Sequence, residues 1–285
     1  MTMATRSVRW VMRQHWTFIA GLFSGTVVVL LLVAAPVISL HDPIAQDLSM
    51  RLQGPGGDHW LGNDQLGRDL WARLLYGGRF SVVVAALTLF LSVTIGTLIG
   101  AWCGRIGGAV DEFVMRVVDV LISFPEIIVA LFLIAIIGPG FGTLVLALTL
   151  VGWTPFARLA RGIALDISSR DYIAAAEVLG CTRTFILLRH VIPNALRPIS
   201  AMTFLRFGHK LITVGALSYL GLGVQPPDSD WGAMLADARQ FAVRQPLLVF
   251  VPGIAIMVTA LSVTLMGQGL EIDADRSRRL RTGQS

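Results

Sequence analysis

Residues 171–198 have the sequence DYIAAAEVLGCTRTFILLRHVIPNALRP, a basic stretch that lies between long apolar runs. Residues that favour helix fill both halves of the stretch, and Gly180 separates the halves. A glycine at such a position ends a helix in a left-handed conformation, and Thr182 is a favoured residue for starting the next helix. The pattern therefore predicts two short helices joined by a sharp turn.

The limits of this helix–turn–helix follow from other local signals. Ser168 and Asp171 have the spacing of a capping box, which predicts a helix start. Pro193 predicts that the second helix ends at about Val191. The alanines at 174–176 give the first helix a thin profile that suits close approach by another protein. The alternative is an amphipathic connector whose arginines lie on anionic lipid, and spacing alone favours neither reading.

The composition indicates a membrane protein. Of the 285 residues, 54% are hydrophobic and 14% are charged, against about 25% charged in soluble domains, and the mean hydropathy is +0.70. The apolar residues gather in runs that approach the ~20 residues needed to cross a bilayer. Runs of this length exclude a large soluble α/β domain. The net charge of +5 is attributed to membrane topology, so no nucleic-acid partner is expected.

Six membrane-spanning helices can be drawn, so the predicted fold class is an all-α polytopic membrane protein. The first run follows a basic tail and lacks a small-residue cleavage site, which indicates a retained span. The segments assigned to the cytoplasm hold 17 Lys and Arg and the outer segments hold 6, which predicts that both termini are cytoplasmic. The predicted spans are 16–38, 80–103, 113–137, 141–156, 203–222 and 247–267.

This assignment divides the chain into a membrane core with tails. The core of five helices covers 80–270. It contains a cytoplasmic loop at about 166–200 and an external loop at 223–246. The other parts are a cytoplasmic tail at 1–15, the first span at 16–38, an external segment at 39–79 and a second cytoplasmic tail at 271–285.

The two outer segments are the long stretches on that side of the membrane. In the second, Asp230 predicts a helix start and residues 231–243 are compatible with helix. Trp60, Trp71 and Trp231 occupy positions where aromatic residues anchor the bilayer edge, and contact with a ligand is the alternative reading.

The third span carries a break signal. The sequence SFPE at 123–126 has a capping-box pattern with Pro125 in the first turn, which predicts an amphipathic helix at 111–122 kinked into the span. Glu126 is attributed to this cap, and Lys210 is counted on the cytoplasmic side. The spans then hold no ionisable residue near their middle, which argues against an ion-coupled carrier.

Motifs for independent chemistry are missing from the sequence. It contains no Walker A loop, HExxH pair or Gly-x-Ser-x-Gly elbow, and Cys103 and Cys181 give neither a disulfide framework nor metal-ligand spacing. The chain is therefore expected to be no enzyme by itself, with no catalytic residue, metal or cofactor of its own. Energy for active transport would come from a partner. A stand-alone channel or carrier and a membrane enzyme are the alternatives.

The quoted stretch resembles the EAA loop of ABC importer permeases. That loop has the pattern E-A-A, three residues, Gly, nine residues and I-x-L-P, which Ala175, Ala176, Gly180 and Pro193 match. Ala174 stands in the position of the Glu, with acidic residues nearby. The resemblance implies that this helix couples the permease to an ATPase through Asp171, Ala174, Ala175, Ala176, Glu177 and Gly180.

Three further stretches are similar to the second permease of the dipeptide/oligopeptide/nickel importer family, namely HWLGNDQLGRDLWARLLYGGRFS, LSYLGLGVQPPDSDWGAML and RHVIPNALRP. The C-terminal stretch GQGLEIDADRSRR departs from the family pattern. The resemblance implies a six-helix permease of the type I ABC importer fold in the bacterial inner membrane.

The same resemblance implies the partners and the cargo. The partners are a homologous permease, two cytoplasmic ABC ATPases that bind ATP and Mg²⁺, an external solute-binding protein and membrane lipid. The binding protein is expected to dock on the outer segments through Trp231, Arg239 and Arg244. Peptides are the expected cargo, with nickel or a metal chelate as the alternative, and the residues that line the pathway stay unassigned.

Overall fold

The computed structural model describes residues 3–282 of the chain and the side chains of residues 16–269. Over this range it contains helices and two isolated β-bridges, and no strand. The elements are α1 (Met3–Val33), α2 (Ala35–Ile38), η1 (Leu48–Met50), α3 (Leu70–Ile106), α4 (Gly108–Ser123), α5 (Glu126–Ile137), α6 (Phe141–Gly152), α7 (Thr154–Ser168), α8 (Asp171–Val178), α9 (Arg183–Ile186), η2 (Leu187–Val191), α10 (Ile192–Tyr219), α11 (Trp231–Ala238), η3 (Arg239–Phe241) and α12 (Leu247–Thr282).

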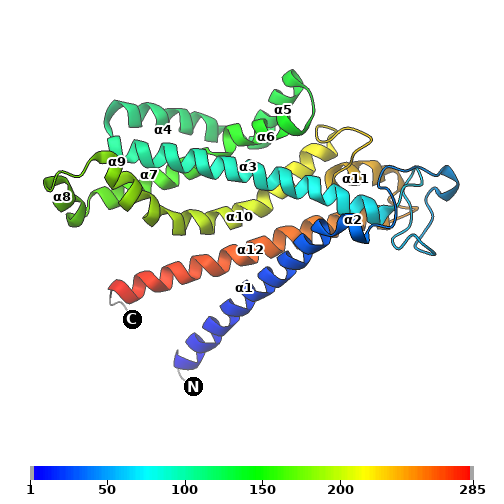
Figure 1. The fold of residues 1–285 in the computed structure, drawn as a ribbon, viewed down its shortest axis with the longest axis horizontal. Coiled ribbons are helices and arrows are strands. Elements are labelled where there is room, and N and C mark those ends of the chain that lie inside the picture. Colours follow the sequence, from blue (N-terminus) through cyan, green and yellow to red (C-terminus); the bar gives the residue numbers. More distant parts are fainter. Residues whose placement is uncertain (1–2, 283–285) are drawn as a thin grey trace.

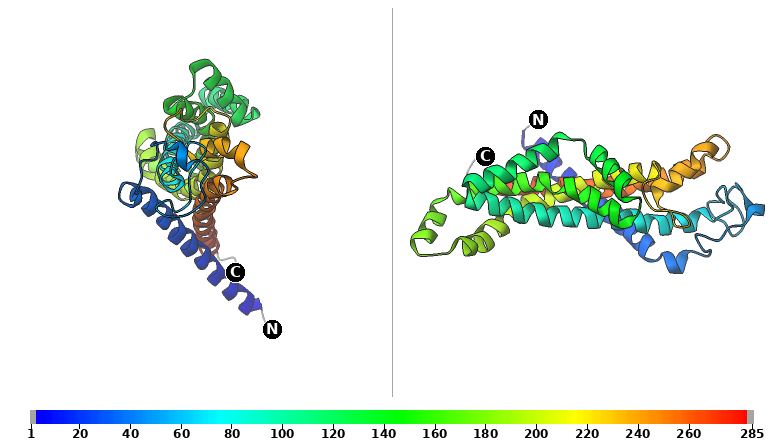
Figure 2. Two further views of the ribbon diagram at one scale, coloured as in Figure 1. Left: turned by 90° about the vertical axis from the view of Figure 1, so that its right-hand side faces the viewer. Right: turned by 90° about the horizontal axis from the view of Figure 1, so that it is seen from above.

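The helices form an elongated bundle with two different ends. Figure 1 shows α8 and α9 at one end, and α11 with the 39–69 segment at the other. The long helices α3, α10 and α12 run between these ends. The start of α1 and the end of α12 both lie toward the α8 end, as the right-hand view of Figure 2 also shows.

Four stretches are long and apolar enough to cross a bilayer: Trp16–Val33, Leu70–Ile106, Phe141–Ser168 and Leu247–Gly269. Helices α4 and α5 form a fifth such stretch only as a pair, bent by 89°. The remaining predicted span, 203–222, lies mostly within α10. The described structure therefore confirms a polytopic helical protein, and the count of six spans stays a prediction.

The break at Pro125 is confirmed, but the predicted capping box is wrong. The backbone of Pro125 begins α5 without a side-chain cap, and the hydroxyl of Ser123 donates to the carbonyl of Val120 instead. The carboxylate of Glu126 accepts from the ammonium of Lys210. Glu126 is therefore held by a helix that is distant in sequence, and the local pattern gave no sign of it.

Lys210 also corrects the expectation that no charge lies within the spans. It belongs to α10 and is 1% exposed. Besides the ion pair with Glu126, its Nζ donates to the carbonyl of Leu148 at 3.3 Å. A buried ammonium needs such partners because water does not reach it. The ion pair fixes the start of α5 against α6 and α10.

Helices α3 and α7 pack with their backbones in close approach. Gly96, Gly100 and Gly104 recur every four residues on one face of α3. A Cβ atom on Gly100 would lie 2.0 Å from the carbonyl oxygen of Ala157, and one on Gly96 would lie 2.3 Å from that of Trp153. Small residues permit this contact between membrane helices, where van der Waals packing stabilises association.

The amphipathic helix predicted at 111–122 is confirmed within α4, and its acidic residues bind α7. Both carboxylate oxygens of Asp111 accept from Arg161 at 2.6 Å, and Asp119 pairs with Arg158. Glu112 and Arg116, in contrast, form an exposed pair at 3.7 Å. The acidic side of α4 therefore fastens this helix to the bundle beside the α3–α7 contact.

Two of the predicted spans begin or end elsewhere in a way that changes the outline of the bundle. Helix α3 begins at Leu70, so the last ten residues of the predicted external segment 39–79 are already helical. Helices α6 and α7 meet at Trp153 and together extend the fourth predicted span to Ser168. Asp69 explains the earlier start of α3, because its side chain accepts from the backbone of Ala72 at 2.7 Å.

Candidate functional site

Helix α8 forms an exposed tip at one end of the molecule (Figure 1). Only Ile173 is buried in it, and this side chain packs into the cluster formed around α7 and α10. Asp171, Ala174 and Ala175 are exposed, and Ala176 is partly buried. The structure therefore brings the predicted coupling residues together on one short helix with a single apolar anchor.

The two ends of α8 show one wrong and one confirmed prediction. Arg170, not Ser168, precedes the first turn, and no side chain caps it. Gly180 has φ +85°, and the turn is closed by the amide of Cys181, which donates to the carbonyl of Ala176 at 3.0 Å. Space is open around Gly180, so its backbone conformation is what requires glycine.

The second arm of the loop does not end where the sequence predicts. Thr182 caps α9 as expected, with its hydroxyl accepting from the amide of Phe185 at 3.2 Å. A π-helical turn, η2, then leads directly into α10, and Pro193 lies in the first turn of α10. Proline is tolerated there because the first turn needs no intrahelical amide donor, so Pro193 begins a helix instead of ending one.

An ion pair connects α8 to the main bundle. Glu177 accepts from Arg105, which lies in the last turn of α3. The sequence predicted Glu177 as a coupling residue but gave no sign of Arg105, 72 residues away. Next to α8, Asp166 accepts from Arg170 at 2.7 Å, and this hydrogen bond raises the pKa of Arg170.

At the opposite end, the predicted cap at Asp230 is confirmed. Its carboxylate accepts from the amides of Gly232 and Ala233 at 2.7 and 3.0 Å. Burial raises the pKa of this carboxyl above its usual range. The following α11 ends at Ala238, five residues before the predicted limit.

Trp231 cannot serve as the docking residue that the sequence predicts. It is 2% exposed, and its indole nitrogen donates to the carbonyl of Leu74 at 2.8 Å. Its backbone amide donates to the hydroxyl of Ser81. Trp231 therefore fastens α11 to α3, whereas Arg239 and Arg244 are exposed and their docking role stays a prediction.

Buried charges support this end of the molecule. Asp64 accepts from Arg68 at 2.7 Å and also from Arg73. Arg73 further donates to Ser229 at 2.8 Å and to Asp237 at 3.2 Å. This network joins the 39–69 segment, α3 and the loop that carries α11. Sequence reasoning missed it, because its partners are up to 169 residues apart, as in the pair of Arg68 and Asp237.

Beside this network lies an open cavity of about 360 Å³. Its wall includes charged and aromatic side chains from α3, together with Pro43, Ile44, Asp228 and Ser229. The α3 residues are Arg73, Tyr76, Arg79 and Phe80. The cavity therefore opens at the end opposite α8.

A bundle of membrane helices with an exposed short helix at one end is a fold that also occurs among solved ABC transporters. The fold matches a chain of the MetNI methionine ABC transporter with a TM-score of 0.53 at 18% identity, over 73% of this chain and 95% of that one. The sequence places the chain within this class of transporters. It belongs to the family of binding-protein-dependent transport system inner membrane components, whose family model matches residues 96–272.

Its curated relatives are permeases of ABC importers for several cargoes. The dipeptide transport system permease protein DppC of Alkalihalophilus pseudofirmus is 35% identical, over 88% of this chain and 83% of the relative. The glutathione permease GsiD of Pectobacterium atrosepticum is 37% identical, over 91% and 86%. The nickel permease NikC of Escherichia coli is 35% identical, over 82% and 85%. The chain is therefore a multi-pass inner-membrane permease of the peptide/nickel importer family. Permease subunits of this family are not enzymes on their own.

Proposed function

We propose that this chain forms half of the translocation pathway of an ATP-driven importer for di- and oligopeptides. In this proposal a homologous permease supplies the other half. Two cytoplasmic ABC ATPases bind ATP and Mg²⁺, and an external solute-binding protein delivers the cargo. The relatives named for dipeptide and glutathione transport support the cargo class.

One observation carries the proposal, the exposure of apolar side chains at the tip of α8. Val178 is 89% exposed and Leu179 is 84% exposed, next to the turn at Gly180. Large apolar side chains at the polar end of a membrane protein suit burial against a partner. We assign this tip to the ATPase contact, which puts the α8 end and both chain termini in the cytoplasm.

The opposite end then faces the solute-binding protein. Arg239 and Arg244 are exposed there, on the loop that carries α11. Charges at the rim of an interface act mainly on the association rate and its salt dependence. Charge reversal at Arg239 is therefore expected to slow docking of the binding protein and to reduce its salt sensitivity. If charge reversal at Arg239 and at Arg244 both left the docking kinetics unchanged, the assignment of these residues to the contact with the binding protein would be wrong.

The coupling role is tested by Ala175→Trp in the assembled complex. The added ring fills space that a partner needs above the exposed alanine, so substrate-stimulated ATP hydrolysis and co-purification of the ATPase should both fall. Phe113→Trp is the control, because Phe113 is an exposed aromatic residue of α4, and it should leave both unchanged. Normal stimulation in correctly assembled Ala175→Trp would support the alternative of a connector on the inner leaflet.

Orientation is tested by cysteine labelling in a variant whose Cys103 and Cys181 are replaced by serine. Single cysteines at Gly56 and Ser229 should react with an impermeant reagent from outside, and one at Thr182 should not. The reverse pattern would invert the proposed orientation.

The cargo is tested by uptake into proteoliposomes that contain the importer and its binding protein. A labelled dipeptide should accumulate with ATP, and unlabelled peptides should compete. The nickel permease of E. coli, at 35% identity, makes Ni²⁺ the second candidate. ATP-driven uptake of Ni²⁺ without uptake of peptide would replace the proposed cargo with this one.

A further inference from the structure

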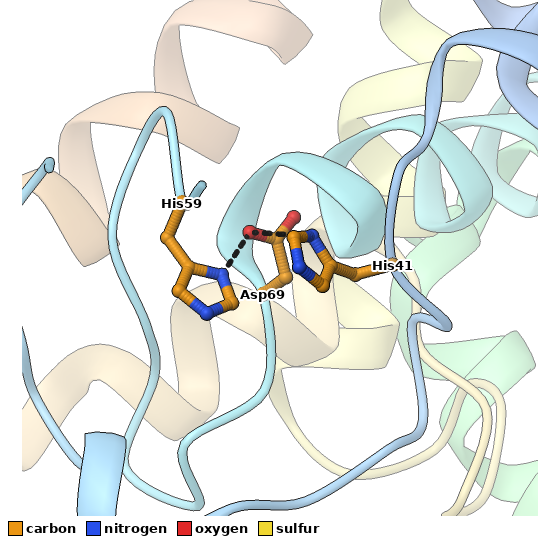
Figure 3. Close-up of side chains that lie close together, drawn as sticks. All are labelled: His41, His59 and Asp69. Carbon is orange, nitrogen blue, oxygen red and sulfur yellow. Dashed lines mark hydrogen bonds and ion pairs between the residues drawn. The ribbon is translucent and has the colours of Figure 1, made fainter. Parts of the chain in front are cut away.

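We propose that His41, His59 and Asp69 form a binding site for one divalent transition-metal ion of the Zn²⁺ or Ni²⁺ type. Each residue offers one ligand atom, and the three atoms lie within 4.8 Å of one another. Figure 3 shows the two imidazole rings on either side of the carboxylate. The site lies at the end opposite α8 and is separate from every residue assigned above to coupling or docking.

The carboxylate of Asp69 is positioned to act as a ligand. Its Oδ1 accepts from the amide of Ala72 at 2.7 Å, which fixes the group at the start of α3. Its Oδ2 lies 2.8 Å from Nδ1 of His59 and 3.9 Å from Nδ1 of His41. Ligands of a tetrahedral Zn²⁺ lie about 3.3 Å apart when each is ~2.0–2.1 Å from the ion. The two observed distances lie on either side of this value, so to admit an ion the His59 ring would move away from the carboxylate and the His41 ring toward it.

Backbone contacts hold His59 and Asp69 in place. His59 is fixed by an isolated bridge to Gly56, with amide-to-carbonyl distances of 3.0 and 3.2 Å. Asp69 forms a second bridge, to Asn63. The rings of His41 and His59 stack with centroids 4.4 Å apart. The backbone around His59 and Asp69 is therefore already in place, which lowers the conformational cost of binding, whereas the two stacked rings must turn before both can direct a nitrogen at one ion.

The donor set and its exposure indicate the kind of ion. Imidazole nitrogens suit Zn²⁺ and Ni²⁺, whereas Mg²⁺ and Ca²⁺ prefer oxygen ligands alone. The side chain of Asp69 is 4% exposed and that of His41 is 34% exposed, so the site is closed on one side and reached by solvent on the other. Three protein ligands then leave a coordination position for water.

A bound ion would fasten the segment after α2 to the first turn of α3. Pro43 and Ile44, which are two and three residues beyond His41, form part of the wall of the 360 Å³ cavity. Metal occupancy would therefore fix Pro43 and Ile44 relative to α3, whose Arg73 and Tyr76 also line the cavity. The alternative is that the three residues form only a hydrogen bond and a ring stack.

The test measures metal bound to the assembled, detergent-purified importer carrying no polyhistidine tag. After equilibrium dialysis against Zn²⁺, Ni²⁺ or Mg²⁺ in parallel, bound metal is counted by mass spectrometry. The parent complex should bind one more Zn²⁺ or Ni²⁺ per copy of this chain than the His41→Phe variant does. This substitution keeps an aromatic ring over His59 but removes the ligand nitrogen. The affinity should fall by more than ~100-fold, since even outer-shell changes at metal sites cost ~10–100-fold. His209→Ala, an exposed histidine of α10, should bind as the parent does.

A second measurement does not depend on a variant folding. Co²⁺ added to the parent complex should give the visible absorption of a site with nitrogen ligands, and Zn²⁺ should displace it. This absorption should be lost in His59→Asn, whose amide can still donate to Asp69. Equal metal content in the parent and in assembled His41→Phe would overturn the proposal, as would a Co²⁺ spectrum unaffected by both substitutions. These outcomes are independent of cargo uptake, so failure here leaves the proposed transport function standing.

Discussion

The ion pair between Glu126 and Lys210 can be tested by removing each partner alone and both together. The side chain of Lys210 is 2% exposed and that of Glu126 is 17% exposed. Loss of one partner of a buried pair costs about 3–5 kcal/mol, because the other charge stays buried without compensation. Glu126→Gln should cost more than Lys210→Met, since it leaves the more deeply buried charge unpaired with only the Leu148 carbonyl nearby.

The double variant Glu126→Gln/Lys210→Met should recover most of the stability. Replacement of a buried ion pair by neutral groups is often close to neutral, so we expect a total cost under about 2 kcal/mol, against about 6–10 kcal/mol for the sum of the single changes. The assay is the free energy of unfolding from SDS titration in mixed micelles, followed by circular dichroism.

The exposed pair of Glu112 and Arg116 gives the matched control. Its atoms are 3.7 Å apart and its side chains are 73% and 76% exposed. Arg116→Met should change the free energy of unfolding by less than about 0.5 kcal/mol, because exposed pairs contribute little. Additive effects of Glu126→Gln and Lys210→Met would refute the buried pair, and so would an effect of Lys210→Met no larger than that of the control.

Three other expectations follow from single contacts. Gly100→Leu should separate α3 from α7, because even a Cβ atom at this position would lie 2.0 Å from the Ala157 carbonyl oxygen. The free energy of unfolding from SDS titration should fall by at least about 2 kcal/mol. Unchanged stability would contradict the close packing. Gly180→Val should cost about 1–3 kcal/mol through its positive φ, and Gly180→Asn clearly less, as measured by thermal unfolding; equal effects would point to a cause other than backbone strain. For Asp230, burial raises the folded-state pKa above the unfolded value of about 3.9, so its charge lowers stability as the pH rises through the folded-state pKa. Asp230→Asn should therefore show a smaller fall in Tm between pH 4 and 7 than the parent protein, and an equal fall would count against this explanation.

The sequence predicts those features that depend on a few neighbouring residues. Gly180, Thr182 and Asp230 each act through their own backbone or through an amide two to three residues away, and all three predictions are confirmed. The break at Pro125 is likewise a local property of proline. The apolar runs predict the class of the fold for the same reason, since each run is contiguous.

The features that the sequence did not predict depend on contacts between distant helices. Glu126 has the spacing of a cap, but Lys210 of α10 lies close enough to bind it. Trp231 occurs in the loop that the sequence predicts to be external, yet α3 provides the pocket that buries it. Arg105 and Glu177 meet only because α3 ends beside α8. A local pattern states what a residue can do, and the packed neighbours decide which of these possibilities is used.

The glycine contacts between α3 and α7 have a mechanical consequence. Because the backbones are in close contact near Gly96, Gly100 and Gly104, sliding or rolling of one helix against the other would break these contacts, so we expect the two helices to move together as one rigid lever. Helix α3 has 37 residues and is therefore about 55 Å long. A tilt of roughly 5° about the distant end of such a lever displaces the α8 end by about 5 Å, close to one helical turn. Only Ser169 and Arg170 separate α8 from α7. A small rotation of the lever would therefore carry α8 through this larger displacement.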